Sequence, residues 1–505
     1  MKTRMSMFKM VEKYWYVAVF VVAALFFWLT MALSFGQPIW FDEGYSILLA
    51  KHSTAELLSL TAVDAHPPLY YLLLKVWSGV FGWGEYAIRS LSAFLMSVAV
   101  VVAALTLRKM FSTKVMLVAI PFILVAPFLL RYGYEVRMYA LATLIAVSAT
   151  YILVRIQSDK RWQWWIPYSV LVALGMYTLY MTVAVWVAHF VWLLVVSIKS
   201  KQRPFWRWPW LYAFAGAVVF FLPYIKTFLY QLTHSALPGM GNEMTIPQLT
   251  NIVSTLSLYT PEWNLGGWGT IVIVIMLVGL SLLGISVYRG LDKNKKRSFM
   301  LITALSVIPI LFYGLISLPP RDPVFIVRYM AHSAIFIYML AGAIVALSLL
   351  KGGKGAIKVR TVIFSAGVLV VLLGGVYILQ KTGNFNFERM QLPLTTAVHR
   401  EARCDNDETV VVADDPYTYI DSAYYFTDCQ LFFYSKDEIA YKGGYAMLHR
   451  SDRRVSSPAD VATPVVVHLG WKGQESAFKP DTRYTLVETI TFDKQVMSRY
   501  KLNAE

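Results

Sequence analysis

Long apolar segments recur from the N-terminus to about residue 380, and short stretches rich in lysine and arginine separate many of them. A membrane interior of roughly 30 Å needs about 20 apolar residues per helix. The segments of this character are residues 15–35, 88–107, 115–131, 138–155, 164–180, 181–198, 209–231, 268–288, 299–318, 328–350 and 361–380. The pattern therefore predicts an α-helical polytopic membrane protein with about 11 transmembrane helices.

A shorter apolar stretch, LYYLLLKVWSGVFG at residues 69–82, cannot span a membrane and predicts a helix lying at the interface. Trp77 and Tyr70 are expected there at headgroup depth, where aromatic side chains are enriched. Composition agrees with a membrane protein, because only 15% of the residues are charged, against about 25% in soluble proteins.

The distribution of lysine and arginine predicts the orientation. With the N-terminus in the cytoplasm, cytoplasmic segments hold 23 of these residues up to residue 380, and the opposite segments hold 8. Such an excess is typical of short cytoplasmic loops. It explains the net charge of +16 without a nucleic-acid partner, because the cations face the anionic lipid bilayer. The alternative, a cleaved signal peptide at residues 1–34, is disfavoured by the length of its apolar run.

Composition changes at about residue 384, beyond which 18 of the 30 acidic residues lie. Alternating strand and helix patterns follow, with strands at 408–414, 430–435, 464–470 and 484–492 and a helix at 416–426. We expect a small extracytoplasmic α/β domain at 384–505. The preceding transmembrane domain, 1–383, has its large outside loops at 36–87 and 232–267.

Both cysteines, Cys404 and Cys429, lie in this C-terminal domain, on either side of a β-α unit. A disulfide between them fits an oxidising compartment outside the cytoplasm. Two buried free thiols are the alternative.

Carboxylates and arginines cluster at the outside ends of the predicted helices. Asp42 and Glu43 directly follow the first span in FDEGYS, and Asp64 and His66 lie in the same loop in VDAHPPLYY. A paired Asp-Glu at a membrane surface is costly unless it is solvated, paired or functional. The pair is therefore the leading candidate for chemistry, and a solvated surface pair is the alternative.

Further candidates lie at later helix ends. Arg89 follows in EYAIRS, and Glu135, Arg137 and Tyr139 lie in YEVRMYAL; Arg328 and Tyr329 lie in VRYM. Arginine binds phosphate and aromatic rings stack on sugars, so this set suits a sugar carried on a lipid phosphate. The alternatives are that Arg89 only snorkels to the interface, that Glu135 and Arg137 pair with each other, and that Asp64 and His66 are turn residues.

The order FDEGYS, HPPLYY, EYAIRS, EVRMYAL and VRYM resembles that of the superfamily C membrane glycosyltransferases. The nearest groups are the family 39-like protein O-mannosyltransferases and lipid A aminoarabinose transferases. The resemblance covers residues 1 to about 380. It implies a polyprenyl-phosphate sugar donor, no nucleotide sugar, and inversion at the anomeric carbon.

The resemblance also implies residue roles. Asp42 looks like the catalytic base, Glu43 would support it or position the acceptor, and Arg89 resembles the arginine that contacts the donor phosphate. Arg137 and Arg328 are further phosphate candidates. The chain lacks a large β-trefoil insertion in its 232–267 loop, which weakens the case for a protein Ser/Thr acceptor over a glycan or lipid.

This chemistry needs one base and positive charge. The acceptor hydroxyl must lose a proton, whereas the leaving phosphate is a weak base that needs no general acid. Arginine or a divalent metal ion could stabilise its charge, and the sequence itself requires no metal. A transporter or flippase of lipid-linked glycan intermediates is the main alternative, and a noncatalytic scaffold is another. The transporter predicts charges at the bilayer midplane and inverted repeats, and neither is evident.

Overall fold

The computed structural model describes residues 13–37, 39–159, 161–200, 204–234, 245–259, 266–318, 326–350, 356–382, 402, 408–492 and 495–503. By its internal contacts the chain divides into two compact units. The first comprises residues 1–35, 86–226 and 237–383, and the second comprises 36–85, 227–236 and 384–505. The loop after the first span thus belongs to the same unit as the C-terminal domain.

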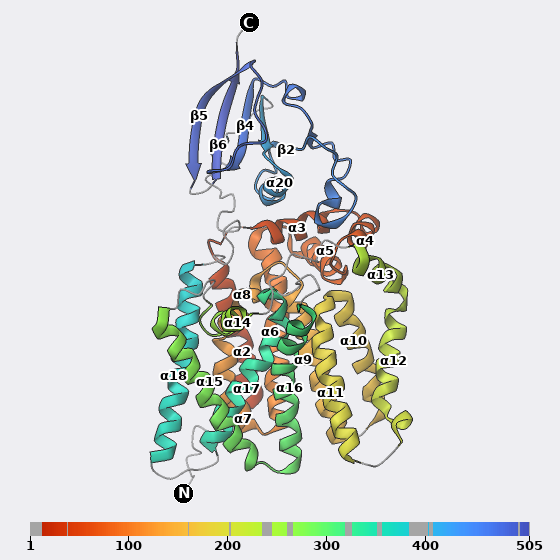
Figure 1. The fold of residues 1–505 in the computed structure, drawn as a ribbon, viewed down its shortest axis with the longest axis vertical. Coiled ribbons are helices and arrows are strands. Elements are labelled where there is room, and N and C mark those ends of the chain that lie inside the picture. Colours follow the sequence, from red (N-terminus) through yellow and green to blue (C-terminus); the bar gives the residue numbers. More distant parts are fainter. Residues whose placement is uncertain are drawn as a thin grey trace. The chain divides into compact units, whose positions relative to one another are not determined.

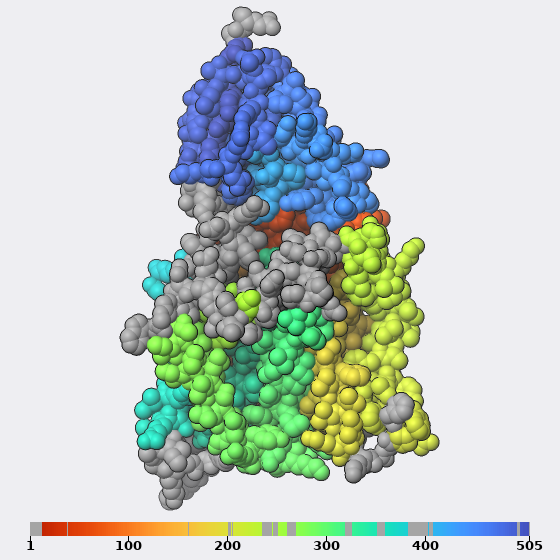
Figure 2. Space-filling view, in the orientation of Figure 1, coloured from red at the N-terminus to blue at the C-terminus, as the bar shows by residue number. Residues whose placement is uncertain are grey.

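Helices, most of them long, make up the first unit and pack along one another (Figure 1). They are α2 (Trp15–Ser34), α6 (Glu85–Met110), α7 (Thr113–Leu124), α8 (Pro127–Tyr134), α9 (Tyr139–Asp159), α10 (Trp165–Thr178), α11 (Val183–Ser200), α12 (Pro209–Phe221), α14 (Ile246–Leu258), α15 (Gly266–Arg289), α16 (Lys293–Ile316), α17 (Ala331–Leu350) and α18 (Ala356–Thr382). Helix α13 (Ile225–His234) continues α12. The surfaces of α11, in yellow, and α16, in green, meet along the face seen in Figure 2.

Within the described ranges, nine helical segments are long and apolar enough to cross a membrane, or ten if the bent pair α7 and α8 is one span. The predicted helical polytopic fold is confirmed, with a span count below the expected eleven. The difference comes from α10, which is helical as expected but has only 14 residues.

The bend between α7 and α8 measures 65° and has a local cause. Pro127 begins α8, and the residue before a proline is disfavoured in the helical region. Ala126 is accordingly extended, with φ −72° and ψ 105°. One apolar run, predicted as a single span, therefore becomes two helices, and the polar end of the second carries Arg131 and Glu135.

Three short helices form the part of the second unit that precedes residue 86: α3 (Phe41–Lys51), α4 (Thr54–Val63) and α5 (Leu69–Phe81). Ser53 and Glu56 form a capping box at the start of α4. Helix α5 forms where the interfacial helix was predicted. Tyr70, expected at headgroup depth, is instead fully buried within the protein, whereas Trp77 is partly exposed.

The C-terminal domain has the predicted α/β character, with one six-stranded sheet in the order β3-β2-β1-β4-β6-β5. Its strands are β1 (Thr409–Ala413), β2 (Gln430–Tyr434), β3 (Arg454–Val455), β4 (Val465–Trp471), β5 (Tyr484–Phe492) and β6 (Gln495–Leu502). The first four in the sheet order are parallel, and β6 and β5 are antiparallel to their neighbours. Helix α20 (Pro416–Ser422) connects β1 to β2.

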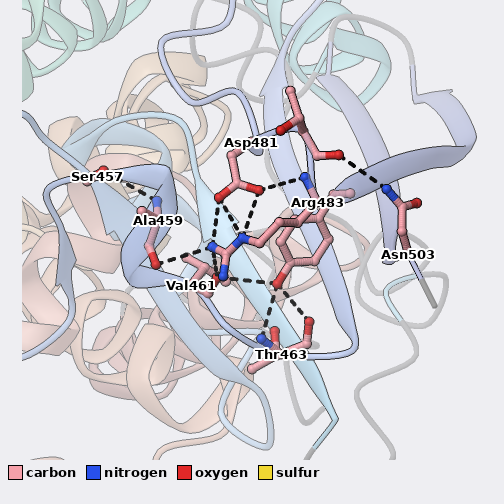
Figure 3. Close-up of polar contacts among 9 residues, drawn as sticks. Ser457, Ala459, Val461, Thr463, Asp481, Arg483 and Asn503 are labelled. Carbon is pink, nitrogen blue, oxygen red and sulfur yellow. Dashed lines mark hydrogen bonds and ion pairs between the residues drawn. The ribbon is translucent and has the colours of Figure 1, made fainter. Parts of the chain in front are cut away.

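Apolar residues of β1 and β4 belong to a buried core that includes Val412, Val466 and Phe478. Arg483, just before β5, hydrogen-bonds to the segment that leads into β4 (Figure 3). Its guanidinium donates to the carbonyl of Val461 at 3.3 Å and to the Asp481 carboxylate at 2.8 Å.

Candidate active site

Asp42 and Glu43 lie in the first turn of α3. The helix starts after Trp40, which is extended and whose carbonyl accepts from the Gly44 amide at 2.8 Å. Carboxylates are favoured at this end of a helix by the partial positive charge of its free N–H groups. Asp42 is 7% exposed and Glu43 is 0% exposed. The pair is therefore buried, and the alternative of a solvated surface pair does not hold.

Asp64 is connected to the same helix. The Tyr45 hydroxyl of α3 donates to Asp64 Oδ2 at 2.8 Å, and His66 Nδ1 lies 3.5 Å from the same oxygen. Burial raises the pKa of Asp64, but the hydrogen bond and charge of His66, together with the Ala65 amide and Tyr45, lower it by more. The structure thus brings Asp64 and His66 together as an ionised carboxylate with an imidazole partner.

Arg89 lies on α6 and is fully buried. Its Nη1 donates to the Ser34 carbonyl at the end of α2 at 3.2 Å, and its guanidinium lies 5.9 Å from the centre of the Tyr134 ring. A side chain that merely snorkels would extend into the interface. Arg89 instead points its charge into the first unit.

Arg131 is one of the eight lysines and arginines assigned above to the outside segments, and it lies near Arg89. Its guanidinium is 5.0 Å from the same Tyr134 ring, and its Nη1 donates to Glu135 Oε2 at 2.7 Å. Arg131, four residues before Glu135, is thus an ion-pair partner of this carboxylate. The Arg137 amide donates to the Glu135 backbone carbonyl at 2.7 Å.

Three arginines of this region, Arg89, Arg131 and Arg137, are buried, as is Glu135. Guanidinium groups bind phosphate through charge-assisted hydrogen bonds, often in pairs. These arginines therefore suit an anionic ligand such as a phosphate.

Tyr139 begins α9, is buried, and its ring centre lies 5.1 Å from that of Tyr132. One turn later, Thr143 donates to the Ala331 carbonyl at 3.3 Å, which joins α9 to the start of α17. The 3-10 turn η5 (Val327–Met330) directly precedes α17 and holds Arg328, partly buried, and Tyr329, buried.

The candidates therefore fall into two groups. Asp42, Glu43, Asp64 and His66 lie in the second unit, and the other predicted membrane-domain residues, from Arg89 to Tyr329, lie in the first. No group of three or more His, Cys, Asp or Glu side chains suited to a metal ion occurs in the described ranges. Cys404 lies outside them, so the Cys404–Cys429 disulfide stays a prediction.

Two comparisons with known proteins bear on this site. Residues 65–226 match the family model described as dolichyl-phosphate-mannose-protein mannosyltransferase. The structure resembles that of ArnT from Cupriavidus metallidurans in its apo state, with a TM-score of 0.58 and 12% identity. The same protein bound to undecaprenyl phosphate gives 0.60 and 12%. Each comparison covers 96% of this chain and 98% of ArnT. A search of curated protein sequences finds no match.

The fold and the matched segment define the class: a multi-pass membrane protein with the fold of ArnT, part of which matches a mannosyltransferase family model. Within that class, the resemblance to the family 39-like group is confirmed by the mannosyltransferase family match, which spans HPPLYY, EYAIRS and EVRMYAL.

Proposed function

We propose that this protein transfers a sugar from a polyprenyl-phosphate donor to a hydroxyl group of a glycan, lipid or protein acceptor. The observation that carries the proposal is the burial of Asp42 and Glu43 at the start of α3, in a chain with the fold of ArnT. A buried carboxylate pair next to a predicted first span requires a reason, and acid–base chemistry supplies one.

In the proposed reaction Asp42 accepts the proton of the acceptor hydroxyl as its oxygen attacks the anomeric carbon. The new bond joins the acceptor oxygen to that carbon. The bond from the carbon to the phosphate oxygen breaks, and polyprenyl phosphate leaves with the electron pair. A single displacement of this kind inverts the anomeric configuration.

The other residues support these two events. Arg89, with Arg131, Arg137 and Arg328, binds the phosphate and stabilises its growing charge. Glu135 orients Arg131 through their 2.7 Å contact. ArnT was solved with undecaprenyl phosphate, a lipid phosphate of the kind proposed as the leaving group here.

The second group prepares the base. Asp64 fixes Tyr45 on α3 through their 2.8 Å hydrogen bond, and His66 keeps Asp64 ionised. Glu43 helps to position the acceptor. Tyr139 and Tyr329 contribute aromatic surface for the donor sugar. We place the reaction on the extracytoplasmic side, with the N-terminus in the cytoplasm and residues 384–505 forming an outside domain.

The test is transfer by purified protein in detergent from a polyprenyl-phosphate-linked sugar. Asp42→Asn keeps the size and hydrogen bonding of the side chain but removes its basicity, so turnover should fall by about 100-fold or more. Arg89→Ala should mainly raise the donor KM, because the phosphate loses a charge-assisted contact. Near-normal turnover by folded Asp42→Asn protein would remove Asp42 from the mechanism. Movement of the lipid-linked sugar across vesicle membranes without transfer would favour the flippase alternative.

A further inference from the structure

We infer that α20 of the C-terminal domain positions α3, and through it the proposed base Asp42. The inference rests on the proposed function, because it assigns the C-terminal domain a part in the same reaction. Both helices belong to the second compact unit and lie beside each other (Figure 1).

The closest contact occurs at Gly44, in the helical body of α3. A Cβ atom at this position would lie 2.6 Å from the backbone carbonyl oxygen of Ile420 on α20. Because that oxygen belongs to the backbone of a helix, a rotamer change cannot move it aside. Only glycine allows the two helices to approach this closely.

Ring stacking fixes the same face of α3 one turn earlier. The rings of Phe41 and Tyr417 stack with centres 4.3 Å apart and planes 2° apart. Residues three apart lie on one face of a helix, so Phe41 and Gly44 together present a single face to α20. Asp42 and Tyr45 share the adjacent face, where Tyr45 binds Asp64.

Two hydrogen bonds hold the ends of the surrounding loop. The Ile39 amide, two residues before α3, donates to the Tyr425 hydroxyl at 2.6 Å. The Tyr424 hydroxyl donates to the Trp83 carbonyl at 3.1 Å. The segment from Tyr417 to Tyr425 thus contacts residues 36–85 at three places: before α3, along α3 and after α5.

Helix α20 is itself held in place by the sheet. The Asp415 carboxylate caps it by accepting from the Thr418 amide at 2.7 Å, and Trp471 Nε1 at the end of β4 donates to the Thr418 hydroxyl at 2.8 Å. Through α20, the six-stranded sheet therefore fixes the position and rotation of α3 within the second unit. A displacement of about 1 Å in a reacting group can cost about 100-fold in rate, so such a support affects turnover directly.

The experiment uses the full-length protein and two matched pairs of variants. Gly44→Ala forces α3 away from Ile420, whereas Gly79→Ala, in α5 of the same loop, meets no atom within 4 Å. Both replace a helical glycine by alanine. Tyr417→Ala removes the stacked ring, and Tyr417→Phe restores it.

We expect Gly44→Ala and Tyr417→Ala to lower kcat by about 10-fold or more with the donor KM changed less than about twofold, because the proposed phosphate ligands lie on other helices. Gly79→Ala should match the wild type, and Tyr417→Phe, which keeps the stacked ring, should have a higher kcat than Tyr417→Ala. A loss of stability alone would lower the melting temperature without lowering kcat selectively over the donor KM. Wild-type kcat in both Gly44→Ala and Tyr417→Ala would overturn the inference.

Hydrogen exchange separates this inference from the proposed function. The amides of residues 41–51 should exchange faster in Gly44→Ala and Tyr417→Ala than in the two controls, whatever reaction the protein performs. If the wild type transfers no sugar, the function is wrong and the exchange result alone decides the positioning role. Unchanged exchange in both variants would overturn that role.

Discussion

The Arg131–Glu135 pair predicts a large and specific loss of stability when one partner is removed. Both side chains are buried, and their ionic contact is 2.7 Å. Removing one member of a buried pair leaves an uncompensated charge and typically costs about 3–5 kcal/mol. Arg89 shares the Tyr134 ring with Arg131, so some positive charge remains near Glu135. We expect Arg131→Met to lower the free energy of unfolding by about 3 kcal/mol, the lower end of that range.

The chain offers a matched control in Arg155 and Asp159, another arginine–acid pair four residues apart on a helix. Their contact is 3.0 Å, but both side chains are partly exposed. Exposed pairs contribute about 0–1 kcal/mol, so Arg155→Met should have little effect. The measurement is equilibrium unfolding in detergent micelles for each variant.

A double variant separates the charge from the packing. Arg131→Met with Glu135→Gln removes both charges, so it should recover much of the stability lost by Arg131→Met alone. Equal losses for Arg131→Met and Arg155→Met would refute the reasoning, since burial would then make no difference to the value of the pair.

Three further predictions concern the C-terminal domain and the topology. Burial raises the pKa of Asp414, but the hydrogen bond from His468 at 3.0 Å and those from nearby backbone amides lower it by more, so the folded pKa lies below its ordinary value. The ionised carboxylate therefore stabilises the fold above about pH 4. This contribution is lost as the pH falls through the folded pKa. Asp414→Asn should flatten the acid limb of stability against pH, and an unchanged limb in urea unfolding would contradict this. Non-reducing peptide mapping should recover Cys404 and Cys429 in one cross-linked peptide, and their disulfide should contribute about 3 kcal/mol; free thiols in an oxidised sample would contradict it. An impermeant thiol reagent on intact cells should label cysteines introduced into loop 232–267 and the C-terminal domain. Protection of both would contradict the predicted orientation, with the N-terminus in the cytoplasm.

The helices and most strands could be predicted because local pattern determines them. Apolar runs of spanning length became helices, and alternating or continuous apolar runs became strands β1, β2, β4 and β5. The bend after α7 had a visible signal in Pro127, but the apolar character of the run continues across it. Hydropathy alone therefore joined two helices that the proline separates.

The Arg131–Glu135 ion pair could not be predicted because the helix before Glu135 was not assigned. Side chains four residues apart lie on the same side of a helix. Once α8 extends to Tyr134, Arg131 becomes a neighbour of Glu135. The spacing of four residues between Arg131 and Glu135 predicts a pair only where the segment is known to be helical.

The association of α3 with α20 left a different kind of signal. Ile39 and Tyr425 are separated by 386 positions, and no local period can indicate such a pairing. Gly44 is nevertheless unusual, since glycine inside a helix costs about 1 kcal/mol relative to alanine. A costly residue beside a candidate base is a reason to expect a close backbone approach, although the sequence does not say which segment approaches. In the structure that segment is α20, more than 370 residues later in the sequence. A local exception to helix propensity thus points to a long-range contact that periodicity cannot reveal.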